Sequence, residues 1–357
     1  MQSGLKDGGF VARIATEIRD WSRGASIRIM HVCGTHEWTI THSGIRDLLP
    51  DNVQVVAGPG CPVCVTPSNE IDALAELSLA ESLTVTTFGD LLRVPGNRTS
   101  LSEAKASGGD IRVVYSVADA IRMAKENPSR EVVHFSIGFE TTAPMTAVEI
   151  VKGLPSNFSV FATHKLIPPA MDFLLNSGAK LDGFICPGHV STIIGLEPYK
   201  ELAEEHGKPM VISGFEPMDV MLGILNIVKQ VKEGTHLAVN GYRRAVRDTG
   251  NEVALSLMKK AFEVRDAHWR GIGIIGSSGL GIRQRYKDHD ATVKYKMEST
   301  YEDRMPKGCS CGEVLLGNMI PEECPLFGDE CKPDHPIGPC MVSFEGSCAI
   351  VYKFKRL

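Results

Sequence analysis

Short runs of apolar, often β-branched residues alternate with segments of helical periodicity along residues 10–233, and this alternation constrains the fold more than any other feature. Buried strands are predicted at 27–32, 53–57, 83–88, 112–115, 131–137, 158–162, 183–186 and 209–213. Helices are predicted at 10–23, 39–49, 68–79, 101–106, 117–126, 169–176 and 218–233, and a further helix ends near Lys152. Strands that alternate with helices pair in parallel, so we expect an α/β fold with doubly wound sheets.

The alternation of predicted strands and helices begins again after Pro128, which indicates two related units. At 357 residues the chain exceeds one typical domain. Motifs of the form Gly-x-His or Gly-x-Glu follow strand ends at Gly34, Gly138 and Gly214. We therefore predict two similar doubly wound parallel-sheet domains, at 1–128 and 129–300, and a small loop-rich, cysteine-rich domain at 301–357.

Composition argues against several classes of partner. The hydrophobic fraction of 43% and the charged fraction of 23% are ordinary for a soluble globular protein. The net charge of −5 gives no reason to expect binding to nucleic acid or to an anionic membrane surface. No apolar run approaches the roughly 18 residues that span a bilayer, and the N-terminus lacks the apolar core of a signal peptide. We expect a cytoplasmic protein with no nucleic-acid or membrane partner.

In a reducing compartment, ten cysteines are better explained as metal ligands or catalytic thiols than as structural disulfides. Cys61 and Cys64 have CxxC spacing between a strand end and a helix, where two thiols either close a disulfide or bind a soft metal. Cys33, His36 and Glu37 follow the preceding strand in the same way, so the two strand ends form a plausible single site. The structural alternative is that Cys33 is a buried small residue and that the backbone satisfies His36.

Four later strand ends also carry ionisable side chains. They are Glu140, His164, His189 and Glu216. Ligands of open α/β sheets bind outside the carboxyl ends of the strands, so two facing domains would bring these residues to one cleft with the three cysteines. The alternative is that the polar residues only cap helices, and for Glu140 and Glu216 the two interpretations are equally good.

A dinucleotide-binding motif is matched at 271–276, where the sequence reads GIGIIG. That motif requires a strand before it and a helix that opens on its glycines. Here the isoleucines lie inside the motif, so the segment itself resembles a strand. We therefore do not predict a nicotinamide or flavin site.

The C-terminal segment holds six cysteines among many glycines and prolines. They are Cys309, Cys311, Cys324, Cys331, Cys340 and Cys348. The segment has too little apolar periodicity to build a core, so a metal centre would have to organise it. A tetrathiolate zinc site is one possibility, although the paired C-x(2–4)-C knuckles of zinc sites are missing. Six spread thiolates also fit a [4Fe–4S] cluster held by four of them, with two left over as a redox pair.

Several of these motifs together resemble the HypD family, which matures the iron centre of [NiFe] hydrogenases. The resemblance runs from about residue 27 to 352. It rests on CGTHE at 33–37, GPGCPVC at 58–64, GFETTAP at 138–144, CPGHVS at 186–191 and the six-cysteine tail. It implies two α/β domains, a [4Fe–4S] domain and a scaffold on which iron receives two cyanides and one carbon monoxide. It also implies complexes with the small chaperone HypC and with the cyanide donor HypE.

The resemblance also gives roles to residues. Cys33 is expected to bind the iron, and His36 and Glu37 to bond its ligands or move protons, with Glu140 and His189 in the same cleft. Cys61 and Cys64 are expected to be redox partners. The tail further resembles the cluster site of ferredoxin:thioredoxin reductase, where a disulfide lies next to the cluster. That likeness implies Cys309, Cys324, Cys331 and Cys348 as ligands and Cys311 with Cys340 as the redox pair, while spacing alone leaves other choices of four open.

Two other functions remain open from the sequence. A stand-alone iron–sulfur thiol–disulfide oxidoreductase would also use Cys61 and Cys64 with a cluster, but would bind no further iron. The second of these functions is that of a structural zinc protein that acts as a partner-binding module.

Overall fold

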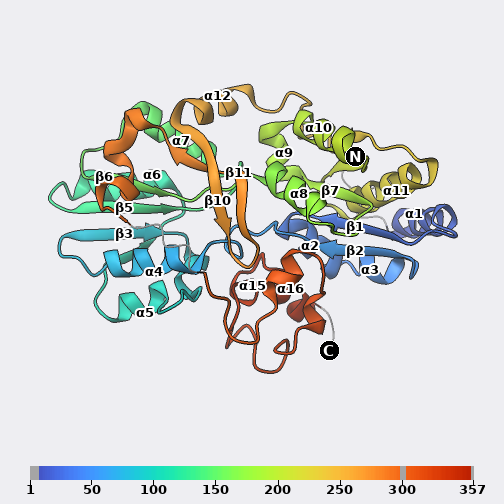
Figure 1. Cartoon of the computed structure of the whole chain (residues 1–357), viewed down its shortest axis with the longest axis horizontal. Coiled ribbons are helices and arrows are strands. Elements are labelled where there is room, and N and C mark those ends of the chain that lie inside the picture. The colour runs from blue at the N-terminus through green and yellow to red at the C-terminus, as the bar shows by residue number, and fades with distance from the viewer. Residues whose placement is uncertain (1–7, 298–302, 355–357) are drawn as a thin grey trace.

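The computed structural model describes residues 8–297 and 303–354, which form two parallel β-sheets, an antiparallel hairpin and a loop-rich C-terminal part (Figure 1). Sheet A has five strands in the order β2-β1-β7-β8-β9, and sheet B has four in the order β4-β3-β5-β6. The strands of sheet A are β1 (Ile27–His31), β2 (Val53–Ala57), β7 (Gly183–Pro187), β8 (Met210–Ser213) and β9 (Ala238–Asn240). The strands of sheet B are β3 (Leu83–Thr87), β4 (Ile111–Val113), β5 (Glu131–Ser136) and β6 (Phe158–Ala162). The predicted α/β class with two parallel sheets is confirmed.

Helices connect these strands and cover both faces of each sheet. Those before β7 are α1 (Gly8–Trp21), α2 (Gly34–His42), α3 (Ile45–Leu48), α4 (Ser68–Leu77), α5 (Leu101–Ala106), α6 (Val117–Glu126), α7 (Ala143–Lys152) and α8 (Ile167–Asn176). The later ones are α9 (Gly188–Ile194), α10 (Glu197–His206), α11 (Pro217–Glu233), α12 (Glu252–Ala261), α13 (Ala291–Lys294), α14 (Cys311–Leu315), α15 (Pro339–Val342) and α16 (Ser347–Phe354). Short 3₁₀ helices are η2 (Gly89–Arg93), η3 (Gln284–His289) and η4 (Pro321–Glu323).

The two sheets do not follow the expected division at residue 128. Strand β1 pairs with β7 through Ile29 and Gly183, so sheet A combines strands from the beginning and the middle of the chain. Sheet B is built from β3 to β6 and is inserted between the two parts of sheet A. A regular succession of strands and helices shows where strands lie, but not which distant strands become neighbours. The three-part sequential division is therefore replaced by one sheet inserted within the other.

Alternate residues of each strand point to opposite faces, and each face has its own helices. In sheet A, Ile29 and Val55 face α1 and α11, while Phe184 and Ile212 belong to the core that includes α8 and α10. In sheet B, α4 and α5 lie over one face, and α6, α7 and α12 over the other. One continuous apolar core runs from sheet B through the hairpin residue Trp269 to sheet A and into the C-terminal part.

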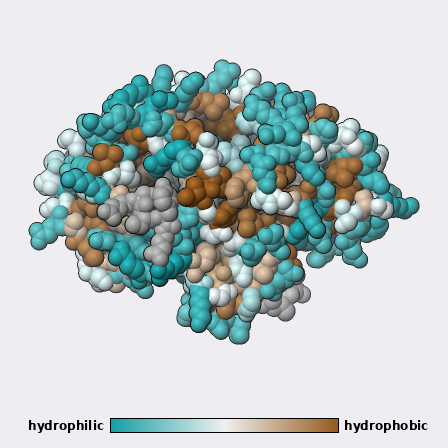
Figure 2. Space-filling model, viewed as in Figure 1, coloured by the Kyte–Doolittle hydropathy of each residue, from teal (hydrophilic) through white to brown (hydrophobic). Residues whose placement is uncertain are grey.

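The hairpin of β10 (Phe262–Trp269) and β11 (Gly273–Ile282) lies between the two sheets (Figure 1). The glycines at 271 and 273 have φ angles of 73° and 114°, so they form the hairpin turn. This confirms that the GIGIIG segment is turn and strand and opens no helix. Figure 2 shows hydrophobic residues gathered near the centre of this face of the molecule.

The C-terminal part packs beneath the junction of the two sheets, and α16 contacts both α2 and α15 (Figure 1). Within residues 8–297 and 303–354, each helix is too short or too polar to cross a lipid bilayer.

Candidate functional site

Cys33 lies at the point where β1 ends and α2 begins. Its backbone is extended, with φ −156° and ψ 129°, at the N-cap position of α2. The free thiol is buried. Burial raises the pKa of Cys33, and the nearby Glu345 carboxylate raises it further, while the backbone N–H groups of Thr35 and His36 lower it. Cys33 is therefore a thiol at rest that needs a metal or a base to become a thiolate.

Gly34 does not leave open space beside the sulfur. A Cβ atom at Gly34 would lie 2.5 Å from the carbonyl oxygen of Glu345 and 2.8 Å from its Cβ. The C-terminal loop therefore packs directly on the first turn of α2. Gly34 is required for this close approach, which brings Glu345 next to Cys33.

His36 and Glu37 lie in the first turn of α2, which begins five residues earlier than predicted and ends where Gly44 turns left-handed, with φ 62°. His36 Nε2 lies 2.9 Å from the carbonyl oxygen of Gly214 and 3.3 Å from that of Ser213. Burial lowers the pKa of His36 to about 3, so the ring is neutral and Nε2 donates. Its Nδ1 is buried and has no hydrogen-bond partner among the described residues, which leaves one acceptor unused.

Glu37 belongs to a buried ionic network. Its carboxylate accepts hydrogen bonds from His31 Nε2 at 2.7 Å, from both terminal nitrogens of Arg46 at 2.8 Å and from Thr41 Oγ1 at 2.6 Å. Burial alone raises a carboxyl pKa, but Arg46 and His31 hold the pKa of Glu37 well below its usual range. Because these donors occupy its lone pairs, Glu37 connects α2 to β1 through His31 and to α3 through Arg46.

Cys61 and Cys64 are joined in a disulfide in the turn that follows β2, four residues before α4 begins at Ser68. The turn packs against the backbone of Cys33: a Cβ atom at Gly60 would lie 2.1 Å from the Cys33 nitrogen. The amide of Gly34 also donates to the Gly60 carbonyl at 3.4 Å. The structure thus places the disulfide beside Cys33, as the neighbouring strand ends led us to expect.

Glu140 lies in the turn after β5 and points into the protein interior. Its Oε1 accepts a hydrogen bond from the Ile167 amide at the start of α8, at 3.0 Å. Its Oε2 is buried with no partner among the described residues, and burial raises the pKa of Glu140 to about 7. An unpartnered carboxyl oxygen with this pKa is suited to holding or releasing a proton.

Two aromatic residues that sequence reasoning missed connect the site. Phe215 lies between two histidines, with ring centroids 4.8 Å from His36 and 4.0 Å from His189. Tyr199 is fully buried; burial raises its pKa, and the charges of Cys186, Glu140 and Cys33 raise it further. Tyr199 therefore lies within electrostatic reach of both Cys33 and Glu140. Tyr199 lies on α10, a helix that the sequence analysis does not predict, so no sequence signal marked it.

Two of the expected cleft residues have other surroundings. Glu216 is the N-cap residue of α11, where its amide donates to Asp219 Oδ2 at 3.2 Å. His164 bonds Ser136 Oγ at 3.2 Å and contacts Phe262, so its neighbours belong to β5 and the hairpin. The capping interpretation is correct for Glu216.

The six C-terminal thiols lie close together. Five of them, Cys309, Cys311, Cys324, Cys331 and Cys348, line one small cavity with the apolar residues Val314, Leu326, Phe327 and Met341. The sulfurs of Cys309 and Cys311 are 3.3 Å apart. The free thiol of Cys340 is hydrogen-bonded to those of Cys311 and Cys348. The amide of Ile337 donates to the Cys331 sulfur at 3.3 Å. Converging thiols in an apolar shell, with an amide donor to sulfur, fit an iron–sulfur cluster.

Arg270 is the second feature that sequence reasoning missed. It is fully buried, its Nη1 donates to the Pro95 carbonyl at 2.8 Å, and its Nε and Nη2 have no hydrogen-bond partner among the described residues. Burial lowers the pKa of Arg270, while the Asp303 carboxylate, 4.0 Å from its Nε, and the thiols of Cys311, Cys309 and Cys340 raise it. A buried cation beside these thiols would offset the negative charge of a thiolate-bound cluster.

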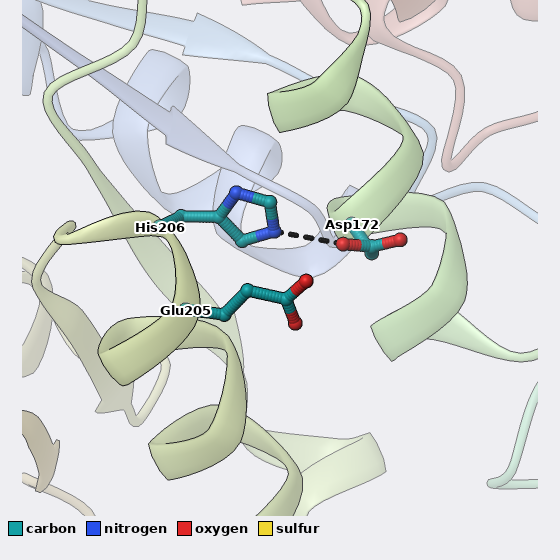
Figure 3. A group of neighbouring side chains, drawn as sticks. All are labelled: Asp172, Glu205 and His206. Carbon is teal, nitrogen blue, oxygen red and sulfur yellow. Dashed lines mark hydrogen bonds and ion pairs between the residues drawn. The ribbon is translucent and has the colours of Figure 1, made fainter.

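A separate group of possible ligands is formed by Asp172 on α8 and by Glu205 and His206 on α10 (Figure 3). Their donor atoms lie within 4.8 Å of one another. However, His206 Nε2 already bonds Asp172 Oδ1 at 2.7 Å, and Asn176 donates to the same oxygen at 3.0 Å. Since Glu205 is exposed, we interpret the group as a surface ion pair.

The family described as "HypD: Hydrogenase formation hypA family" matches residues 9–355. A hydrogenase maturation factor HypD2 from Bradyrhizobium diazoefficiens is 48% identical to this chain, over 92% of the chain and 90% of the relative. The HypD factor of Rhizobium leguminosarum is 46% identical over 97% and 92%, respectively. That of Cupriavidus necator is 43% identical over 99% and 96%.

Proposed function

This chain belongs to the HypD family of hydrogenase maturation factors, and from that premise we propose that it is the scaffold on which the Fe(CN)₂CO group of [NiFe] hydrogenases is assembled. The observation that carries the proposal is the position of Cys33. A free, buried thiol lies at a strand end beside a disulfide, and a loop of the cysteine-rich C-terminal part packs directly on the residue that follows it. A soft thiolate is the protein ligand that suits low-spin iron carrying cyanide and carbon monoxide.

The iron group is the cargo of this site, and Cys33 is its proposed ligand. Binding requires that Cys33 lose its proton, and the nearby carboxylate of Glu345, whose pKa burial raises, is the proposed acceptor. Because the loop that carries Glu345 covers Gly34 so closely, cargo must enter and leave with a displacement of that loop. His189 and Phe215 form the side of the site that faces His36.

The C-terminal thiols are proposed to hold a resident [4Fe–4S] cluster, with Cys309, Cys324, Cys331 and Cys348 as its ligands. When bound, the cluster supplies single electrons. Cys311 and Cys340, in contact with each other, form the proposed redox pair. Reduction of the Cys61–Cys64 disulfide takes up two electrons and two protons and yields two thiols beside Cys33.

We further propose that the protein forms complexes with a HypC-type chaperone and a HypE-type cyanide donor, in the cytoplasm. The relatives are maturation factors, and a maturation factor must pass its product to other proteins.

Infrared spectroscopy tests the proposed function. The protein is purified without oxygen together with a HypC-type partner, and its spectrum is recorded in the region of metal-bound cyanide and carbon monoxide. Bands of both ligands are expected. A sample with full cluster content and no such bands would reject the scaffold.

The observation that favours a second function is the contact between the disulfide and the backbone of the segment that carries Cys340. Cys64 Sγ lies 4.0 Å from the carbonyl oxygen of Pro339, the residue before Cys340. A stand-alone iron–sulfur thiol–disulfide oxidoreductase would use the same contact. It would show disulfide turnover without the infrared bands.

A further inference from the structure

A cavity of about 310 Å³ lies at the carboxyl end of β6, next to α4 and the hairpin. Thr163, His164 and Lys165 directly follow β6 and line it, together with Glu70 from α4 and Arg265 from β10. The carboxyl end of the strands is where open α/β sheets bind ligands. The proposed iron site uses none of these residues, so the cavity is a separate feature of sheet B.

Lys165 is the least expected residue of this lining, because it is a lysine with only 2% of its surface exposed. Its Nζ has one hydrogen-bond partner among the described residues, Thr163 Oγ1, at 3.3 Å. Within residues 8–297 and 303–354, no carboxylate oxygen lies within 4.0 Å of the Lys165 Nζ, so the ammonium has no ion pair there. An ammonium has three N–H donors, and leaving them unpaired in the interior is costly.

The acidic residues of the lining already have other hydrogen bonds. Glu70 Oε2 accepts from Thr163 Oγ1 at 2.6 Å, and the same hydroxyl accepts from Lys165, so it lies between the two charged groups. Asp266 Oδ1 accepts from the Ser277 amide at 2.9 Å. Arg265 donates to the Ala162 carbonyl at 2.9 Å, and it too has no ion pair within residues 8–297 and 303–354. Two cations therefore border one cavity with unused donors.

His164 adds a polar group to the same wall. It is 1% exposed, its Nε2 bonds Ser136, and its Nδ1 has no hydrogen-bond partner among the residues described. Burial lowers the pKa of His164 to about 3, so it contributes a neutral ring and no charge.

We propose that this cavity binds a small oxyanion, whose oxygens accept hydrogen bonds from Lys165 and Arg265. Both carboxylate and phosphate groups have this chemistry. Such a ligand would neutralise the buried ammonium and use donors for which the described residues provide no acceptor. The cavity volume is at the lower end of the range for small-molecule sites, which fits a small metabolite.

Calorimetric titration of the full chain tests the proposal. Sodium acetate and inorganic phosphate are used as separate probes at constant ionic strength, so that the stronger binder identifies the class. Lys165→Met should weaken binding about tenfold or more, because one charge-assisted hydrogen bond is lost. Lys259→Met, which removes an exposed lysine on α12, is the matched control and should bind as the wild type does.

Two results would overturn the proposal: no binding of either probe to the wild type, or equal affinity in Lys165→Met and Lys259→Met. If Lys165→Met does not fold, Arg265→Gln makes the same test on an exposed side chain. It should weaken binding severalfold, and unchanged affinity in this variant would equally reject the site.

Discussion

Cys64 Sγ lies 4.0 Å from the carbonyl oxygen of Pro339, so the disulfide of sheet A touches the segment that carries Cys340. Both cysteines are fully buried. The sequence separates them by more than 270 residues, and the fold makes them neighbours. This contact connects the C-terminal thiols, the Cys61–Cys64 disulfide and the strand end that carries Cys33.

Replacement of Cys33 tests the proposed iron ligand. Cys33→Ala should abolish the infrared bands of cyanide and carbon monoxide in the co-purified complex, because the thiolate that binds the cargo is lost. Cys186→Ala, which removes another buried thiol from sheet A, should keep them. Bands at full intensity in Cys33→Ala would place the iron on other residues, with Cys61 and Cys64 the next candidates.

Replacement of the C-terminal thiols tests the assignment of ligands. Cys324→Ala and Cys331→Ala should lose iron and sulfide, since both thiols are among the four proposed cluster ligands. Cys311→Ala and Cys340→Ala should retain the cluster and lose electron delivery. Iron and acid-labile sulfide analysis decides the matter, and a full complement in Cys324→Ala would show that the ligand set is wrong.

Thiol counting tests the redox role of Cys61 and Cys64. Mild reduction of the native protein should raise the number of titratable thiols by two, and air oxidation should reverse this. The Cys61→Ser, Cys64→Ser double variant is the control, and its count should not change. If the wild-type count stays constant as well, the pair does not cycle.

Glu140 predicts a pH-dependent difference in stability. Burial raises its pKa to about 7, above the ordinary 4.5, so the folded state holds a proton that the unfolded chain releases. The stability that this group contributes is complete below pH 4.5 and is lost as the pH rises toward 7. Glu140→Gln should match the wild type near pH 4 and exceed its unfolding free energy by at most about 3 kcal/mol at pH 8.

Urea unfolding at the two pH values measures this difference. Glu201→Gln, on an exposed carboxylate of α10, serves as the control and should show no such dependence on pH. A difference between Glu140→Gln and the wild type that is the same at pH 4 and pH 8 would contradict the prediction.

Glu37→Gln should destabilise the protein by about 3–5 kcal/mol, because it leaves the guanidinium of Arg46 without its buried anion. Glu76→Gln breaks an exposed pair with Arg98 and should cost less than about 1 kcal/mol. Chemical denaturation compares the two variants. A small effect of Glu37→Gln on stability, together with loss of the infrared bands, would instead favour a direct role in assembly.

Local pattern was enough to predict most of the strands and helices. The predicted strands at 53–57 and 158–162 coincide with β2 and β6, because β-branched residues there are bounded by clear turn signals. The hairpin strand β10 was missed, since residues 263–266 are all exposed, Val264 included, and the short alternation there marks no buried face. The pairing of β1 with β7 was also missed, because pairing depends on contacts far apart in the chain.

The site was partly predictable for the same reason. Residues with distinctive chemistry, such as Cys33 and the CxxC pair, are visible in the sequence. Both follow predicted strands, and the carboxyl ends of parallel strands form the ligand-binding edge of an α/β sheet, so their proximity could be predicted. Tyr199 and Arg270 are common residue types in unremarkable segments, and only burial gives them significance. The capping role of Glu216 depends on where α11 starts, which sequence patterns locate only to within a few residues.

The interleaving of the two sheets sets an order for assembly during synthesis. All four strands of sheet B have left the ribosome soon after residue 162 is made, whereas sheet A at that stage has only β1 and β2. Sheet A is incomplete until β7, β8 and β9 have been synthesised, and the last of these ends at Asn240. The loop that packs on Gly34 is synthesised about a hundred residues later. A nascent chain therefore completes sheet B first. Cys33, the first of the ten cysteines to be synthesised, is among the last to receive its final surroundings.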